Sequence, residues 1–234
     1  MQDDSTSFSD ALTSVFESST LAVDACARDI CAVIDSCAQS KNVCRLAFCG
    51  GTAARLVIKR LTELRKNFVG VEFYLADERC VAVGDPGRND QLLIELLVDT
   101  GLVSRDAFHS IPAERGAVNA ASTYATILGS FTRFDAIFLS IGDDGHVASI
   151  FPQHPSIDAS GVAIAVQDAP KSPSERVSLS LDTIRAASHR FVMGIGEAKS
   201  DALARIRSGW DPPAVRVEPT RWYLDRAALH DIRG

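Results

Sequence analysis

The stretch LAFCGGTAARLVIKRL, residues 46–61, joins a short apolar run to a helical pattern through two adjacent glycines. The apolar run is too brief for a helix, and paired glycines let a chain turn tightly between a strand and a helix. Comparable short apolar runs recur along the chain: RLAFCGG, VEFYLADER, FDAIFLSIGDDG, GVAIAV, RVSLSL, HRFVMGIG and RWYLD. Helical patterns at 52–66, 90–98, 117–128 and 197–206 separate several of them. Such alternation predicts an α/β fold with a mainly parallel, doubly wound sheet and helices on both faces, a Rossmann-like three-layer sandwich.

The segment before residue 40 has a different pattern. Apolar residues from Leu12 to Cys37 keep a spacing of three and four that is broken at Ser19. This predicts an amphipathic helix that opens the fold, with an interruption near residues 18–20 and Ser9 as its N-cap. No repeat or linker divides the chain, so we expect residues 1–234 to form a single domain.

Composition limits the classes of function. The chain has 234 residues, 46% of them hydrophobic and 23% charged, with a formal net charge of −6. This balance disfavours nucleic acid and anionic membranes as partners, because both attract basic surfaces. No apolar run is long enough to span a bilayer, and the acidic, polar start MQDDSTSFSD is unlike a targeting peptide. We therefore expect a cytoplasmic protein, which can still bind a small anion if cations gather in one cleft.

The cysteines indicate no special chemistry. Six are present, and none forms a C-x-x-C pair: Cys26, Cys31, Cys37, Cys44, Cys49 and Cys80. Neither a zinc site nor a disulfide framework is indicated, so we predict reduced thiols that act as small apolar side chains.

Candidate site residues follow the predicted strands, where ligands of parallel sheets bind. Gly50 and Gly51 place N–H groups of a helix N-terminus where they can bind an anion, although a purely structural turn explains them equally well. Asp77, Glu78 and Arg79 end another strand, which indicates either a cleft mouth or an ion-pair network.

The sequence GDDGH ends a third strand and carries His146. Asp144 can hold the imidazole in one tautomer, leaving the other ring nitrogen to take a proton from water. Arg176 begins a later strand, and Lys199 lies in the first turn of a predicted helix, where a cation opposes the helix dipole unless an anion binds.

Together these motifs resemble the glucosamine-6-phosphate isomerase/6-phosphogluconolactonase family, on its lactonase side. The resemblance is carried by CGGTAARL, DERCV, Arg88-Asn89, GDDGHVASIFPQHP, RVSLSL and GEAK, in the order of the family's motifs. It implies hydrolysis of 6-phospho-D-glucono-1,5-lactone to 6-phospho-D-gluconate in the oxidative pentose phosphate pathway, by a carboxylic ester hydrolase without metal or organic cofactor. It also implies that His146 is the general base.

The resemblance implies the remaining site residues as well. Arg176 and Lys199 are expected to meet the phosphate, and Asp77 to orient the base or bind a hydroxyl. The substrate-binding set is Gly50, Gly51, Thr52, Asp77, Arg79, Asn89, Asp144, Gly145, Arg176 and Lys199. The chain departs from the family pattern at Cys49, Ala53, Ala54, Arg88, Val147 and Gln153.

Three alternatives remain at this stage. A glucosamine-6-phosphate deaminase/isomerase would use Asp77 for proton transfer, but that branch resembles GHIAFNEP where this chain has GHVASIFPQHP. A non-catalytic sugar-phosphate-binding protein, such as a regulator's effector domain, would need an added DNA-binding segment. A Cys49 nucleophile paired with His146 is the third. We expect a monomer or weak dimer that binds no nucleic acid and no membrane.

Overall fold

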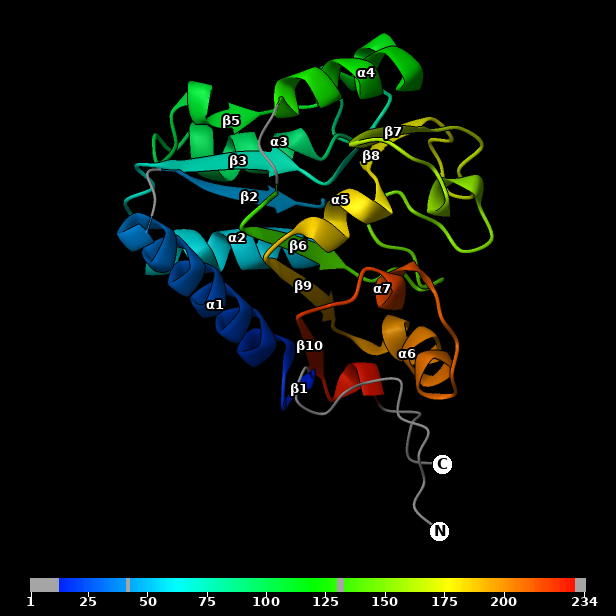
Figure 1. Ribbon diagram of the computed structural model, residues 1–234. Helices are drawn as coiled ribbons and strands as arrows, with labels where there is room; N and C mark the ends of the chain where they lie inside the picture. Colours follow the sequence, from blue (N-terminus) through cyan, green and yellow to red (C-terminus); the bar gives the residue numbers. More distant parts are fainter. Residues whose placement is uncertain (1–12, 41–42, 130–132, 230–234) are drawn as a thin grey trace.

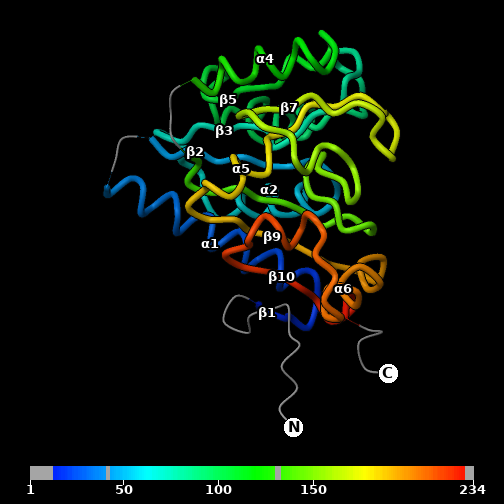
Figure 2. The backbone as a smooth tube through the Cα atoms, turned by 45° about the vertical axis from the view of Figure 1, so that its right-hand side comes forward, coloured from blue at the N-terminus to red at the C-terminus, as the bar shows by residue number. Residues whose placement is uncertain are grey.

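The computed structural model describes residues 13–40, 43–129 and 133–229. Within these residues, seven strands form one sheet in the order β1-β10-β9-β6-β2-β3-β5, and every neighbouring pair is parallel. The strands are β1 (Thr13–Phe16), β2 (Cys44–Phe48), β3 (Val71–Leu75), β5 (Phe108–His109), β6 (Ala136–Ser140), β9 (His189–Gly194) and β10 (Arg221–Asp225). The sheet runs from β5 at the top of Figure 1 to β1 at the bottom, and the turned view in Figure 2 keeps this order.

Helices cover both faces of the sheet. The α-helices are α1 (Ser19–Ser40), α2 (Thr52–Leu64), α3 (Asp90–Leu93), α4 (Ala117–Leu128), α5 (Leu181–Ala186), α6 (Ser200–Arg207) and α7 (Pro213–Arg216). The shorter helices are the π-helix η2 (Ile94–Val98) and the 3-10 turns η3 (Arg105–Ala107), η4 (Ala113–Arg115), η5 (Pro155–Ile157) and η6 (Glu197–Lys199).

The order of the strands decides which face each helix covers. Connections through α1, α2 and α3 move toward the β5 edge, whereas those through α4, α5 and α6 move toward the β1 edge. Because crossovers between parallel strands are right-handed, the two groups cover opposite faces. Helix α1 packs beside α2, as Figure 1 shows. The predicted three-layer α/β fold is therefore confirmed.

A second, antiparallel sheet covers one end of the first. It has the order β4-β8-β7, with β4 (Asp77–Arg79), β8 (Arg176–Leu179) and β7 (Ala163–Val166). The runs GVAIAV and RVSLSL thus lie outside the parallel sheet. No helical pattern separates them, and adjacent strands without a long crossover pair antiparallel. This pairing brings Arg176 opposite Arg79, directly beyond the end of β3.

The predicted N-terminal helix is wrong before Ser19. Residues 13–16 form a strand that pairs with β10, with Thr13 opposite Trp222. A four-residue segment fits a strand or a helix equally well by its apolar spacing, and the open edge of β10 decides in favour of a strand. The predicted break near 18–20 separates β1 from α1, whose buried stripe includes Val23, Ile30 and Ile34. Ser9 and Leu12 lie outside the described residues.

The remaining sequence predictions fit the core. Phe48 on β2 packs against Phe73 and Phe138 on the two neighbouring strands, with ring centroids 6.2 and 5.9 Å apart. Four of the six cysteines are buried, which agrees with the predicted role of these residues as small apolar side chains. Among the described helices, none has the length and apolar character needed to cross a bilayer.

Candidate active site

A cleft of about 340 Å³ lies beyond the carboxyl ends of β2, β3, β6 and β9. It is the place where the predicted strand-end residues meet. All the predicted site residues line it except Asp144 and Gly145. Residues 49–53, Asp77, residues 140–146 and residues 195–199 come from four successive strand ends, as expected for ligand sites in parallel sheets.

The two glycines of the loop after β2 have separate structural roles. A Cβ on Gly50 would lie 1.9 Å from Oδ1 of Asn89, so only glycine lets that side chain approach the loop. Gly51 has φ +91°, a conformation that favours glycine, and forms the N-cap of α2. The backbone at Gly51, Thr52 and Ala53 therefore borders the cleft at a helix N-terminus, where N–H groups bind anionic oxygens.

The charged segment after β3 divides into a supporting group and a cleft group. Glu78 is fully buried and accepts hydrogen bonds from the backbone N–H groups of Arg79, Asn89 and Asp90 at 2.7–2.8 Å. Burial raises the pKa of Glu78 to about 7, against the opposing effect of these N–H groups. Glu78 thus holds the two cleft-lining segments together and does not itself line the cleft.

Asp77 and Asn89 lie in the cleft wall and fix each other. Asn89 Nδ2 donates to the backbone oxygen of Asp77 at 3.0 Å and to its Oδ1 at 3.1 Å. Ser149 Oγ donates to Asp77 Oδ2 at 2.7 Å. Both carboxylate oxygens of Asp77 therefore accept hydrogen bonds inside the protein, which makes the group a fixed acceptor beside the substrate space.

Arg79 lines the cleft, and a hydrogen bond to the backbone holds its side chain there. Its Nη1 donates to the backbone oxygen of Gly87 at 2.7 Å. Its Nε is buried and has no hydrogen-bond partner within the described residues. A buried donor without a partner carries a free-energy penalty, so Arg79 is incompletely satisfied where it borders the cleft.

His146 and Asp144 form the predicted pair. His146 Nδ1 hydrogen-bonds Asp144 Oδ1, which also accepts the backbone N–H of His146 at 3.2 Å. Burial alone would raise the pKa of Asp144, but the hydrogen bond and charge of His146 lower it to about 2. An ionised Asp144 directs the proton to Nδ1 and leaves Nε2 as the basic nitrogen. The imidazole also packs on Phe151, with ring centroids 4.8 Å apart.

Close packing requires glycine at two positions next to this pair. A Cβ on Gly142 would lie 2.1 Å from His146 Nδ1 and 2.6 Å from Asp144 Oδ1. Gly145, between Asp144 and His146, has φ +79°, and a Cβ there would lie 2.4 Å from the Trp210 ring. Gly145 does not line the cleft, and its close neighbour is Trp210.

Four cations border the cleft, and the sequence analysis missed one of them. Arg176 is buried and donates to the backbone oxygens of residues 171–173 at 2.9–3.1 Å. It thereby holds the loop that carries Lys171, whose Nζ pairs with Asp143 and lies 3.7 Å from Asp144. Burial lowers the pKa of Lys199, which caps α6 beside this group. Lys171 precedes β8 on an irregular loop, so no periodic pattern marked it.

Cys49 has the wrong electrostatic surroundings for a nucleophile. Burial raises the pKa of its thiol to about 12, and its Sγ accepts the backbone N–H of Ser140 at 3.3 Å. Nucleophilic cysteines need the thiolate, which this site disfavours.

Comparisons with known proteins identify the family of the chain. The sequence profile for glucosamine-6-phosphate isomerases/6-phosphogluconolactonase matches residues 17–226. The chain belongs to this family. A 6-phosphogluconolactonase of Streptomyces coelicolor is 32% identical over 183 residues, which cover 69% of this chain and 70% of the relative.

Solved structures support the fold but do not separate the branches of the family. The crystal structure of 6-phosphogluconolactonase from Thermotoga maritima has a TM-score of 0.83 at 22% identity, over 92% of this chain and 99% of the other. A monomeric glucosamine-6-phosphate deaminase has a TM-score of 0.81 at 15% identity, over 94% and 99%. Both branches therefore share this fold, and the choice between their activities rests on the site.

Proposed function

We propose that the protein hydrolyses 6-phospho-D-glucono-1,5-lactone to 6-phospho-D-gluconate, a carboxylic ester hydrolysis in the oxidative pentose phosphate pathway. The observation that carries this proposal is the His146–Asp144 pair in a cleft that four cations border. An imidazole oriented by a carboxylate suits the activation of water, and the cations suit a phosphorylated substrate. The similarity to a lactonase at 32% identity supports the same choice.

The chemistry assigns a role to each group. His146 Nε2 takes a proton from a water molecule that attacks the lactone carbonyl carbon, and Asp144 stabilises the imidazolium that forms. Backbone N–H groups at Gly50 and Gly51, or the guanidinium of Arg79 at the cleft wall, stabilise the negative oxygen of the tetrahedral intermediate. When the intermediate collapses, the carbon–oxygen bond of the ring breaks and His146 returns the proton to the departing ring oxygen. No metal or organic cofactor takes part in these steps.

Phosphate recognition is assigned to Lys171, Lys199 and Arg176 on the side of the cleft formed by β8 and η6. Arg176 is occupied by backbone oxygens, so its larger contribution is to hold Lys171 in place. Binding energy from a remote phosphate orients the lactone against His146, which is how such contacts accelerate a reaction.

The test follows hydrolysis of freshly generated 6-phosphogluconolactone by wild-type and His146→Ala protein, with chelator present and spontaneous hydrolysis subtracted. We expect removal of the general base to lower kcat about 100- to 10,000-fold. Unphosphorylated gluconolactone tests the phosphate requirement, and ammonia release from glucosamine 6-phosphate tests the deaminase. A His146→Ala protein with a near wild-type rate would refute the assignment of the base. No hydrolysis above background would refute the proposed activity.

Two finer points rest on the sequence alone. We place the protein in the cytoplasm, as a monomer or weak dimer that binds neither nucleic acid nor membranes, on the basis of its composition and negative charge. Sedimentation of the purified chain tests the oligomeric state, and fractionation of the source cells tests the location.

A further inference from the structure

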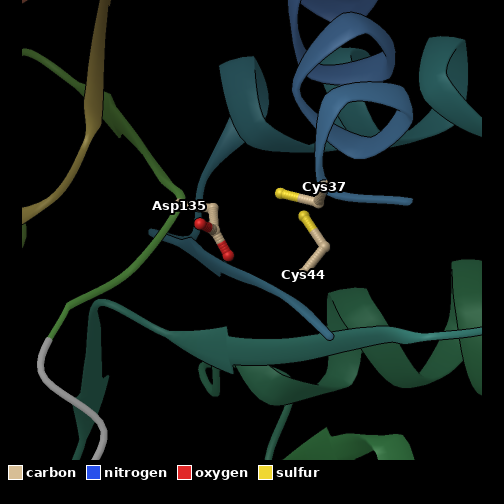
Figure 3. Close-up of side chains that lie close together, drawn as sticks. All are labelled: Cys37, Cys44 and Asp135. Carbon is tan, nitrogen blue, oxygen red and sulfur yellow. The ribbon is translucent and has the colours of Figure 1, made fainter. Parts of the chain in front are cut away.

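A second cluster of reactive side chains lies at the amino ends of the parallel strands, opposite to the cleft at their carboxyl ends. It consists of Cys37 near the end of α1, Cys44 at the start of β2 and Asp135 directly before β6. All three residues are buried, with at most 7% of each exposed. Figure 3 shows the two sulfurs and the carboxylate pointing toward one another from three separate segments of the chain. We propose that this cluster binds a thiophilic divalent cation of the zinc type.

The geometry fits a tetrahedral metal ion. The two Sγ atoms and a carboxylate oxygen of Asp135 lie within 4.8 Å of one another. Around tetrahedral zinc, with bonds of about 2.0–2.3 Å, ligand atoms are separated by roughly 3.5–3.8 Å. Side-chain movements of about 1 Å therefore assemble three ligands, and water takes the fourth position, as in zinc sites with three protein ligands.

The chemistry favours a cation over a redox pair. The two sulfurs and the carboxylate oxygen form a mixed set of donors that zinc accepts. On binding, each thiol releases its proton to solvent, each sulfur forms a bond to the metal, and the divalent charge offsets the negative charges of the ligands. A Cys37–Cys44 disulfide would use only the two sulfurs, whereas a metal uses all three groups.

The backbone already orients the carboxylate. Asp135 Oδ2 accepts the backbone N–H of Arg45 at 2.8 Å, and Asp135 N–H donates to the Arg45 oxygen at 2.9 Å. The backbone oxygen of Asp135 accepts the N–H of His189 at 3.0 Å. Hydrogen bonds of this kind fix a metal-binding carboxylate before the metal arrives. The site would therefore fasten the end of α1 to β2 and β6.

The spacing of residues in the sequence does not reveal this set of ligands. Zinc motifs are read from cysteine and histidine pairs a few residues apart, whereas this set joins a helix end, a strand start and a loop that is distant in sequence. The fold brings them together because β2 and β6 are neighbours in the parallel sheet.

Cobalt(II) is the probe, because thiolate ligation gives a sulfur-to-cobalt charge-transfer band that other ligands do not. The chain is reduced, stripped of metal and titrated without oxygen in a His146→Ala background, since Asp143, Asp144 and His146 form a second set of close ligand atoms. We expect one equivalent to bind with the charge-transfer band. Zinc should displace the cobalt and raise the melting temperature.

Four variants decide the assignment. Cys37→Ser, Cys44→Ser and Asp135→Asn should each weaken binding by at least the roughly 10- to 100-fold that loss of an outer-shell partner costs. Cys31→Ser, which removes a partly exposed thiol from the same helix, should bind as the parent does. Asp135→Asn keeps an oxygen for the Arg45 N–H, and circular dichroism with cooperative unfolding verifies that it folds, independently of any lactonase activity.

The proposal is overturned if one equivalent of cobalt gives no charge-transfer band. It is also overturned if folded Asp135→Asn and the two serine variants keep the parent's affinity. Recovery of a Cys37–Cys44 disulfide in a chain that takes up no metal would replace the metal site with a redox pair.

Discussion

Gly142→Ala should disable the catalytic pair without unfolding the protein. The added Cβ would lie 2.1 Å from His146 Nδ1, 2.2 Å from its Cε1 and 2.6 Å from Asp144 Oδ1. Because Cβ atoms stay at least 3.0 Å from such neighbours, the imidazole has to move by about 1 Å. Gly142 does not have a positive φ, so alanine fits the backbone itself.

The expected loss follows from that displacement. A misplacement of about 1 Å in a catalytic group can lower the rate about 100-fold. At 1.36 kcal/mol for each tenfold change, this corresponds to about 2.7 kcal/mol of transition-state stabilisation. The free energy of unfolding should fall by about 1–3 kcal/mol, the usual cost of adding a methyl group to tightly packed space, which leaves the protein folded.

Steady-state lactone hydrolysis and urea unfolding are measured on the same preparations. Gly116→Ala is the matched control: Gly116 has φ 81° and ψ 153°, lies outside the cleft, and a Cβ there meets no atom within 4 Å. It should lose about 1–3 kcal/mol of stability by backbone strain and keep its kcat. The expected loss in kcat for Gly142→Ala is about 100-fold. If its kcat stays within about twofold of the wild-type value, the tight packing around His146 does not determine the rate.

Three further predictions concern the cleft and its support. Lys171→Ala and Lys199→Ala should each lower kcat/KM about 10- to 100-fold for the phosphorylated lactone, mainly through KM, and leave unphosphorylated gluconolactone unchanged; equal losses on both substrates would contradict a phosphate role. Cys49→Ala should keep kcat near wild type, and inactivation would restore the thiol as a nucleophile. Glu78 has a folded-state pKa of about 7, above its usual 4.5, so its contribution to the free energy of unfolding falls as pH rises from about 4.5 to 7. Glu78→Gln should remove that decline in urea unfolding at pH 5 and 7, and an unchanged slope would assign it elsewhere.

The parallel sheet could be predicted because apolar periodicity within a short segment shows whether that segment forms a strand or a helix. Strand and helix patterns alternate over most of the chain, and helix 117–128 was predicted with its observed limits. The strand at residues 13–16 was not predicted, because four residues show too little periodicity and the partner strand β10 lies near the other end of the chain. In the antiparallel sheet β4-β8-β7, the three-residue strand β4 was not predicted for the same reason, since its partner β8 is distant in the sequence.

Site residues could be predicted where a residue type stands at an unusual position in the sequence. They could not be predicted where the role of a residue depends on a neighbour that is distant in the sequence. His146 after a strand and glycines before a helix are visible in a sequence. Lys171 is not, because its position depends on a loop that Arg176 holds through backbone oxygens. The supporting role of Glu78 also depends on contacts with residues that lie on the far side of a loop.

At two of the positions that depart from the family pattern, the residue present makes contacts that stabilise the site. Cys49 stands where the family has serine, and its Sγ accepts the Ser140 N–H that a hydroxyl could accept. Arg88 stands where the family has serine before Asn89, and this buried guanidinium bonds Asp90 at 2.7 Å and Glu114 at 3.2 Å. A larger, charged side chain thus fixes the segment that carries Asn89 through ion pairs. Because the proposed substrate-binding residues are unchanged at both places, the divergence at Cys49 and Arg88 does not argue against lactone hydrolysis.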